Sequence, residues 1–237
     1  MFLLGIQSVS KQVKSKQRVA DHGEVFTAER EVKAMCDLVK TETERIDSRF
    51  LEPACGDGNF LAEILRRKLD VVKRKYQAVT MDYERFSLLA MGSLYGVDIM
   101  QDNCEACRER LYTIWDEAYK NVCPKEINAN CRLSARFILS RNIVCGNALS
   151  LMCVDENQCD TDEPIVFSEW TFPFNNTLIQ RKDYSFAELL LAAEESQKVK
   201  DTRQLNLFAN AKTKEIEPKL LKQYLIDYRE LHHEHDK

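Results

Sequence analysis

The sequence has 237 residues, 44% hydrophobic and 30% charged, with a formal net charge of −4. This composition is typical of a globular protein that is long enough for one sizeable domain plus extensions. No apolar run approaches the roughly 18 residues of a membrane-spanning helix, and no secretory signal precedes the basic residues near the N-terminus. We therefore expect a cytoplasmic protein without membrane contact. The acidic balance excludes a strong overall attraction for nucleic acid.

Two residue types invite a functional interpretation that we weigh against a simpler one. Nine cysteines occur, an odd number for a disulfide framework. Cys104 and Cys107 have metal-ligand spacing, but Cys123 and Cys131 form no second close pair, so we predict reduced thiols and no bound metal. Basic residues cluster over 11–18, 66–68 and 73–75. Solvated helix faces explain such runs most simply, with DNA contact as the minor alternative.

Helices and strands are expected to alternate along most of the chain. Apolar spacing predicts a first helix from Thr27 to Val39, with Thr27 as its N-cap. The strand 49–52, the loop 53–58 and a helix with Phe60, Leu61, Ile64 and Leu65 on one face follow. Further helices are expected over 82–91 and 101–119, and further strands over 94–97, 142–145 and 165–167.

This alternation predicts an α/β fold with a doubly wound, mainly parallel sheet and helices on both faces. The pattern changes near residue 183. A helix is expected over 186–194, a polar stretch over 195–214 and an amphipathic helix over 219–232. The predicted organisation is an N-terminal extension 1–20, a main domain 21–182 and a partly helical extension 183–237.

The loop after the first strand carries the strongest chemical signal. It is formed by Glu52, Pro53, Ala54, Cys55, Gly56, Asp57 and Gly58. Two glycines allow a tight turn and close approach of the backbone to a ligand. The following helix N-terminus favours a carboxylate or phosphate. A glycine-rich loop between strand and helix also occurs in dinucleotide binders, although the GxGxxG spacing is absent here.

The heptapeptide resembles motif I of class I methyltransferases, in the form found in adenine-specific DNA methylases of restriction–modification systems. Upstream, the stretch HGEVFT (22–27) is similar to motif X of that family. Downstream, YGVDI (95–99) resembles motif II, and CGNAL (145–149) resembles motif III. The resemblance covers roughly residues 20–170, and the order of its motifs makes it more specific than any one of them.

The resemblance implies a Rossmann-like methyltransferase fold with S-adenosylmethionine as cofactor. Residues 52–58 would bind the cofactor, and Phe26 and Thr27 would contact its methionine part. Asp98, followed by Ile99, would accept hydrogen bonds from both ribose hydroxyls, although a helix N-cap is the simpler role for this aspartate. Asn147 and Ala148 would face the adenine. Asn147 replaces the usual aspartate of the family, so an amide stands where a carboxylate is expected.

One family motif is missing. Methylation of a base requires a flipped nucleotide, which the family holds with Asn/Asp-Pro-Pro-Tyr/Phe after the fourth strand. The chain has five prolines, no two of them adjacent, so it cannot contain this motif. Glu169 and Trp170 are weak substitutes, since a carboxylate can accept from the amine and an indole can stack. The alternative is that the catalytic motif lies on a longer gene product or on a separate polypeptide.

The sequence therefore predicts an S-adenosylmethionine-binding DNA methylase (adenine-N6) of a restriction–modification system that is incomplete or split. We expect the chain alone to be inactive and to reach DNA through a missing region or a partner subunit. Two alternatives stay open. One is a catalytically inactive cofactor-binding subunit, and the other is a class I methyltransferase acting on a protein or small molecule.

Overall fold

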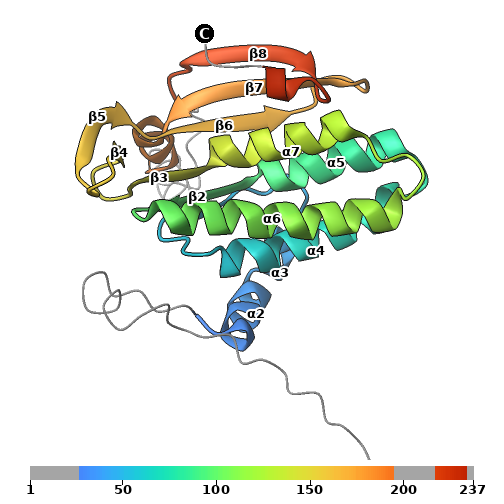
Figure 1. Cartoon of the computed structure of the whole chain (residues 1–237), viewed down its shortest axis with the longest axis horizontal. Coiled ribbons are helices and arrows are strands. Elements are labelled where there is room, and N and C mark those ends of the chain that lie inside the picture. Colours follow the sequence, from blue (N-terminus) through green and yellow to red (C-terminus); the bar gives the residue numbers. More distant parts are fainter. Residues whose placement is uncertain (1–26, 195–216, 234–237) are drawn as a thin grey trace, which may run out of the picture.

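The computed structural model describes residues 27–194 and 217–233. Figure 1 shows a layer of helices with an antiparallel sheet stacked on one side of it. The helices are α2 (Glu29–Leu38), α3 (Lys40–Thr43), α4 (Asn59–Tyr76), α5 (Thr80–Gly92), α6 (Gln101–Val122) and α7 (Ala129–Asn142), with a 3-10 turn η1 (Leu231–His233). A further helix covers residues 186–194. None of the described helices is long and apolar enough to cross a membrane.

The first sheet is mixed. Its strands lie in the order β1 (Phe50–Glu52), β2 (Leu94–Asp98), β3 (Ile143–Asn147), β4 (Met152–Val154) and β5 (Asp160–Pro164). The first three run parallel, whereas β4 and β5 form an antiparallel hairpin at the end of β3. The predicted α/β class is confirmed at this level.

Each connection between the parallel strands contains two helices. Helix α4 and its partner α6 pack against the sheet face that carries Leu94 and Ile143. The opposite face carries Tyr95 and Val97, which lie in a second apolar cluster with Phe186. The second face is therefore covered by the helix 186–194, where a doubly wound sheet would have a crossover helix.

A second sheet consists of β6 (Val166–Thr171), β7 (Leu178–Ser185) and β8 (Lys222–Asp227), all antiparallel. The strand predicted at 165–167 therefore joins this sheet and not the parallel one. The amphipathic helix predicted over 219–232 is wrong, because β7 offers a free edge with which residues 222–227 pair. Strand β7 also runs across the boundary expected at 182/183 and connects the two segments.

Two further differences concern helices. Helix α7 was missed because polar Ser134 and Asn142 lie on its buried side and weaken the apolar periodicity. Its N-cap is Asn128, whose side chain accepts from the Cys131 backbone N–H at 3.0 Å. Thr27 does not cap α2, because the cap position is Ala28 and no side-chain cap bond is formed.

Lys68 departs most clearly from its expected place. We expected the basic residues 66–68 on a solvated helix face, but Lys68 is fully buried. Its ammonium donates to the carbonyl oxygens of Ile46 and Ser48 and, at 2.5 Å, to the hydroxyl of Ser93. Burial lowers the pKa of Lys68 to about 7. The side chain thus fastens the segment before β1 to α4 and to the start of β2.

Candidate functional site

The glycine loop at the end of β1 has the geometry that its sequence predicts. Gly56 and Gly58 have φ angles of 52° and 86°, in the left-handed region that favours glycine. The Gly58 N–H donates to the Cys55 carbonyl at 2.8 Å and closes the turn. A Cβ atom on Gly58 would lie 2.7 Å from the sulfur of Cys107. No larger residue fits at position 58 without displacement of the Cys107 side chain, which belongs to α6.

Asp98 ties this loop to the end of β2. Its carboxylate accepts from the backbone N–H of Gly56 and of Met100, both at 2.9 Å, and from the Asn103 side-chain amide at 3.1 Å. Only 9% of the residue is exposed. A carboxylate has about four acceptor positions, so these three bonds leave one for a ligand hydroxyl, whereas acceptance from both ribose hydroxyls was expected. Met100, and not Asp98, is the N-cap of α6.

The segment before α2 lies next to the same loop. The carbonyl oxygen of Thr27 accepts from the side-chain amide of Asn59, the first residue of α4, at 3.4 Å. Thr27 and the glycine loop, which are far apart in the sequence, therefore meet at one edge of the sheet. Phe26 lies outside the described residues.

The acidic residues of the loop have different surroundings. Glu52 is half-buried, and this burial raises the pKa of its carboxyl. A hydrogen bond from the backbone N–H of Ala54 offsets part of the rise in pKa. Asp57 is paired with Arg110 of α6 at 2.8 Å, and the same guanidinium donates to Asn59 at 2.5 Å. Pro53 and Ala54 are exposed at the tip of the turn.

The third predicted element lies beyond β3. The side-chain oxygen of Asn147 accepts from the Leu149 N–H, and its amide donates to Asp160 of β5, both at 3.0 Å. Ala148 packs against the apolar cluster that contains Tyr95 and Val97 of β2. Ile99 accepts a weak hydrogen bond from the Cys145 thiol at 3.6 Å. Asn147 is thus engaged in the turn between β3 and β4, and adenine would have to compete with Asp160 for its amide.

Glu169 and Trp170, the weak catalytic candidates, do not meet this site. Glu169 pairs with Arg49, which precedes β1, whereas the glycine loop follows β1. Four residues of extended chain lead from Arg49 to the start of the loop at Pro53, which corresponds to about 13 Å. Trp170, on the other face of β6, is buried against Gly92 and Phe137. In this structure the two side chains point in different directions, and the indole has no open face on which a base could stack.

Sequence reasoning missed the residues that support the site from α6. Asn103 and Arg110 hold Asp98 and Asp57, and Cys104 donates to the Asp98 carbonyl at 3.6 Å. The positions of these residues along the helix that follows residue 98 could have indicated these contacts. That inference requires knowing that the strand and the helix are adjacent. The described residues contain no group of three or more His, Cys, Asp or Glu arranged to hold a metal ion.

Comparisons with protein-family models, with curated proteins and with solved structures found no match to this chain.

Proposed function

We propose that this chain is the S-adenosylmethionine-binding part of an adenine-N6 DNA methylase of a restriction–modification system, with a Rossmann-like methyltransferase fold. One observation carries the proposal. The Gly56 N–H donates to the Asp98 carboxylate at 2.9 Å, so the glycine loop of the first strand and the acid of the second strand form one unit. Ligands of open α/β sheets bind at the carboxyl ends of neighbouring strands, which is where this unit lies.

The residues of this edge suit the parts of such a cofactor. Asp98 keeps an acceptor for a ribose hydroxyl, and Pro53 and Ala54 are exposed at the tip of the turn that Gly56 and Gly58 form. The carboxylate of Glu52 lies at the same end of β1 and suits the ammonium of the methionine part. When bound, the cofactor supplies a methyl group on a sulfonium. The residues of this chain bind and orient it.

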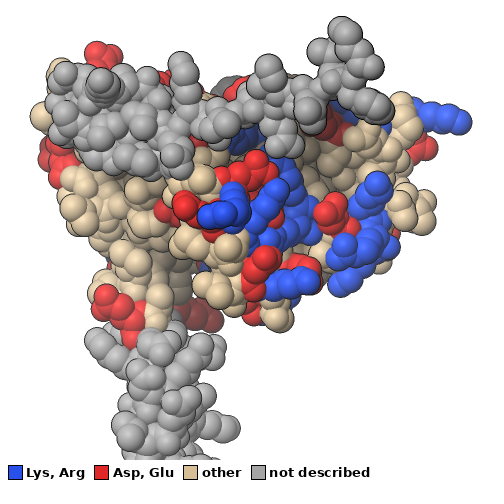
Figure 2. Space-filling model, turned by 90° about the horizontal axis from the view of Figure 1, so that it is seen from below, with Lys and Arg blue, Asp and Glu red and all other residues tan. Residues whose placement is uncertain are grey.

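The same proposal assigns the grip on the base to a region outside residues 1–237, either on a longer gene product or on a separate polypeptide. The chain contains no Pro-Pro pair, and Glu169 lies at the opposite end of β1 from the loop. Figure 2 shows acidic and basic side chains interspersed on one face of the molecule, not a field of one sign that would attract DNA. Without a grip on the amine the reacting atoms are not aligned, and a misplacement of about 1 Å alone can cost on the order of a hundredfold in rate.

Calorimetry with S-adenosylmethionine and with its demethylated product tests the cofactor site. We expect one site per chain for each ligand. Absence of binding of both ligands at millimolar concentration would overturn the proposal.

A tritiated-methyl transfer assay on unmethylated DNA at low salt tests the division of labour. We expect no incorporation by the chain alone and incorporation after addition of a polypeptide that carries Asn-Pro-Pro-Tyr. Robust incorporation by the chain alone would contradict the assignment of the base grip to a partner. Transfer to a protein or small molecule without DNA would favour the alternative class of methyltransferase.

A further inference from the structure

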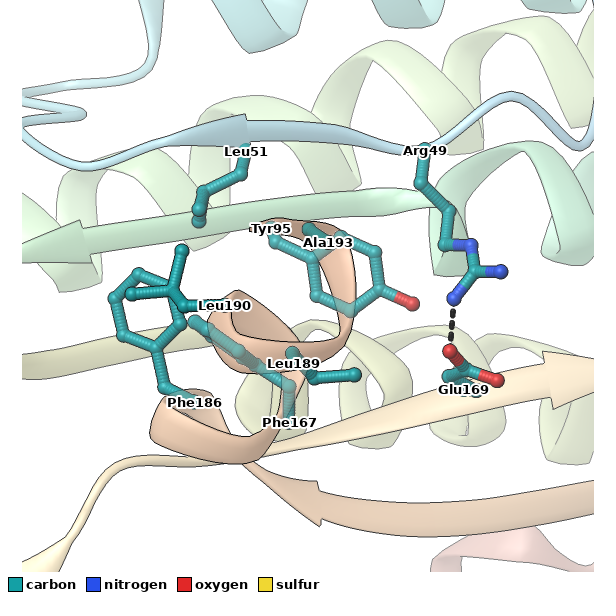
Figure 3. Close-up of a pocket in the computed structure, with 9 residues that line it drawn as sticks. All are labelled: Arg49, Leu51, Tyr95, Phe167, Glu169, Phe186, Leu189, Leu190 and Ala193. Carbon is teal, nitrogen blue, oxygen red and sulfur yellow. Dashed lines mark hydrogen bonds and ion pairs between the residues drawn. The ribbon is translucent and has the colours of Figure 1, made fainter. Parts of the chain in front are cut away.

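A small cavity lies beside β1, the strand at one edge of the mixed sheet. Its volume is about 270 Å³. Most of its lining is apolar and comes from β1, β2, β6 and the helix that follows β7: Leu51, Tyr95, Phe167, Phe186, Leu189 and Leu190. We call it the β1–β6 slot, because Figure 3 shows it between Leu51 of β1 and residues of β6, with the helix 186–194 as a wall.

The size of the slot limits its ligands to small molecules. An apolar cavity of about 150 Å³ can hold a benzene molecule, whereas pockets for drug-sized ligands measure roughly 300–1,000 Å³. The volume of about 270 Å³ therefore has room for one apolar side chain and for a small polar group attached to it.

The slot has an apolar end and a polar end. Leu51 and Phe186 lie at one end, as Figure 3 shows. At the other end Arg49 and Glu169 form an ion pair, and the hydroxyl of Tyr95 points toward this pair. Burial raises the pKa of Tyr95, so its hydroxyl stays neutral. Ligand pockets typically combine a mostly apolar lining with a few convergent polar groups that fix the orientation of the ligand. The slot has this composition.

The ion pair at the polar end favours a ligand that carries both charges. The side chains of Arg49 and Glu169 are 60% and 20% exposed, and a pair so close to water contributes little to stability, so a ligand can separate it. A ligand with one charge would pair with one of the two side chains and leave the other without its partner. A zwitterion, in contrast, offers an anion to Arg49 and a cation to Glu169.

We propose that the β1–β6 slot binds a free α-amino acid with an apolar side chain. The ligand carboxylate accepts from Arg49, the ligand ammonium donates to Glu169, and the side chain lies in the apolar part of the slot. An α-amino acid suits this arrangement, because its two charged groups and its side chain leave from the same carbon atom. Leu51 is 40% exposed in the empty slot, so the ligand side chain would remove apolar surface from water, which stabilises the complex.

This inference goes beyond the proposed cofactor site. Consecutive side chains of a strand point to opposite faces, so Glu52, which suits the cofactor, and Leu51, which lines the slot, face opposite sides of the sheet. Arg49 precedes β1, whereas the glycine loop follows it. We therefore expect the slot and the cofactor site to be filled independently. Because S-adenosylmethionine itself carries an amino-acid group, competition between the two ligands has to be measured.

Calorimetry with L-phenylalanine tests the proposal. We expect one site per chain, with a dissociation constant in the millimolar range or below. Three matched ligands each lack one feature: phenylpropanoate lacks the ammonium, phenylethylamine lacks the carboxylate, and L-serine lacks the apolar group. Each should bind at least about tenfold more weakly, because it loses a charged hydrogen bond or the burial of the ring.

Variants of the ion pair assign the two charges of the ligand. Arg49→Ala leaves Glu169 without a partner, so it should weaken phenylalanine binding and strengthen phenylethylamine binding. Glu169→Ala should weaken phenylalanine binding and strengthen phenylpropanoate binding. A pair with a purely structural role would change the affinities for all these ligands alike. Glu109→Ala is the matched control, because it removes an exposed ion pair with Arg136 and neither residue lines the slot. It should change each dissociation constant less than twofold.

Three results would overturn the proposal. The first is no binding of phenylalanine at millimolar concentration by a chain that circular dichroism shows to be folded. The second is binding of phenylpropanoate or phenylethylamine as tight as that of phenylalanine, which means that the slot does not recognise a zwitterion. The third is competition between phenylalanine and S-adenosylmethionine, which assigns the ion pair to the methionine part of the cofactor. Binding of phenylalanine without binding of S-adenosylmethionine would contradict the proposed function and support this inference, so the two failures are distinguishable.

Discussion

The two ends of the parallel strands are held together by different chemistry. At the carboxyl ends, Asp98 accepts from backbone N–H groups of Gly56 and Met100. At the other end, Glu84 of α5 is fully buried and accepts from the hydroxyls of Tyr119 and Tyr228 and from Arg229 at 2.6 Å. The first end joins a loop to a strand, and the second joins the last described residues to the helical layer.

The difference distinguishes the proposed binding edge from a structural joint. The proposed binding edge has exposed residues, Pro53 and Ala54, at the tip of its loop, and 9% of Asp98 stays exposed. In the joint, the buried polar groups form hydrogen bonds with one another. Arg181 and Asp183 are a second example, since they form a bidentate pair at 2.8 and 2.7 Å beside Ser168. A buried charge that loses its partner is costly, whereas one near solvent can rehydrate. The two ends should therefore respond unequally to the removal of a carboxylate.

The largest effect is expected at the joint. Glu84→Leu leaves two buried tyrosine hydroxyls and Arg229 without their acceptor and should reduce the free energy of unfolding by about 3–5 kcal/mol. Glu84→Gln keeps an acceptor and should cost less, about 1–3 kcal/mol. Urea unfolding followed by circular dichroism measures both. The control is Glu109→Ala, which removes an exposed pair with Arg136. Equal losses for Glu84→Leu and Glu109→Ala would contradict the distinction between the two ends.

The sequence predicts these two ends unequally well. The proposed cofactor edge is formed by short segments with strong local signals: a strand, a turn that needs glycine at 56 and 58, and a helix with one apolar face. The resemblance to motifs I and II predicted that Gly56 and Asp98 serve one site, and a hydrogen bond joins these two residues in the structure. The contact of Asp98 with Asn103 was missed, because it depends on the angle at which α6 leaves β2.

The joint could not be predicted in this way. Glu84 and Tyr228 are separated by 144 residues, and no local pattern relates them. The periodicity of residues 219–232 favours a helix, and only the free edge of β7 makes residues 222–227 a strand. Lys68 was misplaced for the same reason, since its acceptors come from two other segments. Local propensity is overridden where partners distant in sequence decide.

The second effect concerns the binding edge. Asp98→Ala should weaken S-adenosylmethionine binding by about 1.5–3 kcal/mol, the value of hydrogen bonds to a charged group. Asp98→Asn keeps the shape and one acceptor and should lose less. The measurement is calorimetry at constant ionic strength. Arg110→Ala separates binding from loop support, because Arg110 contacts Asp57 and Asn59 and not Asp98. Unchanged affinity in Asp98→Ala would remove this carboxylate from the cofactor site.

The third effect is the pH dependence that Lys68 contributes. Its pKa is about 7 in the folded chain and its ordinary value is 10.5, so between these values the unfolded chain binds the extra proton. Stability should therefore rise with pH from this source, by about 1 kcal/mol per pH unit just above pH 7. Burial raises the pKa of the Cys145 thiol to about 12, and this group acts in the opposite direction once unfolded thiols ionise. The midpoints of urea unfolding should be measured at pH 7.0, 7.5 and 8.0. These values lie below the ordinary thiol pKa of 9.0, so the contribution of the thiols to the pH dependence stays small.

Lys68→Met isolates the lysine, because the thiols are the same in both proteins. The difference in unfolding free energy between wild type and variant should grow in favour of the wild type as the pH rises through this window. A constant difference would mean that the ammonium stays protonated in the folded chain, stabilised by its three oxygen acceptors.

The smallest effect is expected for the ion pair between Arg49 and Glu169, which Figure 3 shows. The side chains of Arg49 and Glu169 are 60% and 20% exposed, so water screens their attraction. Arg49→Ala and Glu169→Ala should each change the free energy of unfolding by about 0–1 kcal/mol, and less in 1 M salt. A double-mutant cycle at low and high salt measures the coupling. A coupling energy as large as the loss in Glu84→Leu would place this pair with the buried joint, and would make β1 an integral part of it instead of an open edge.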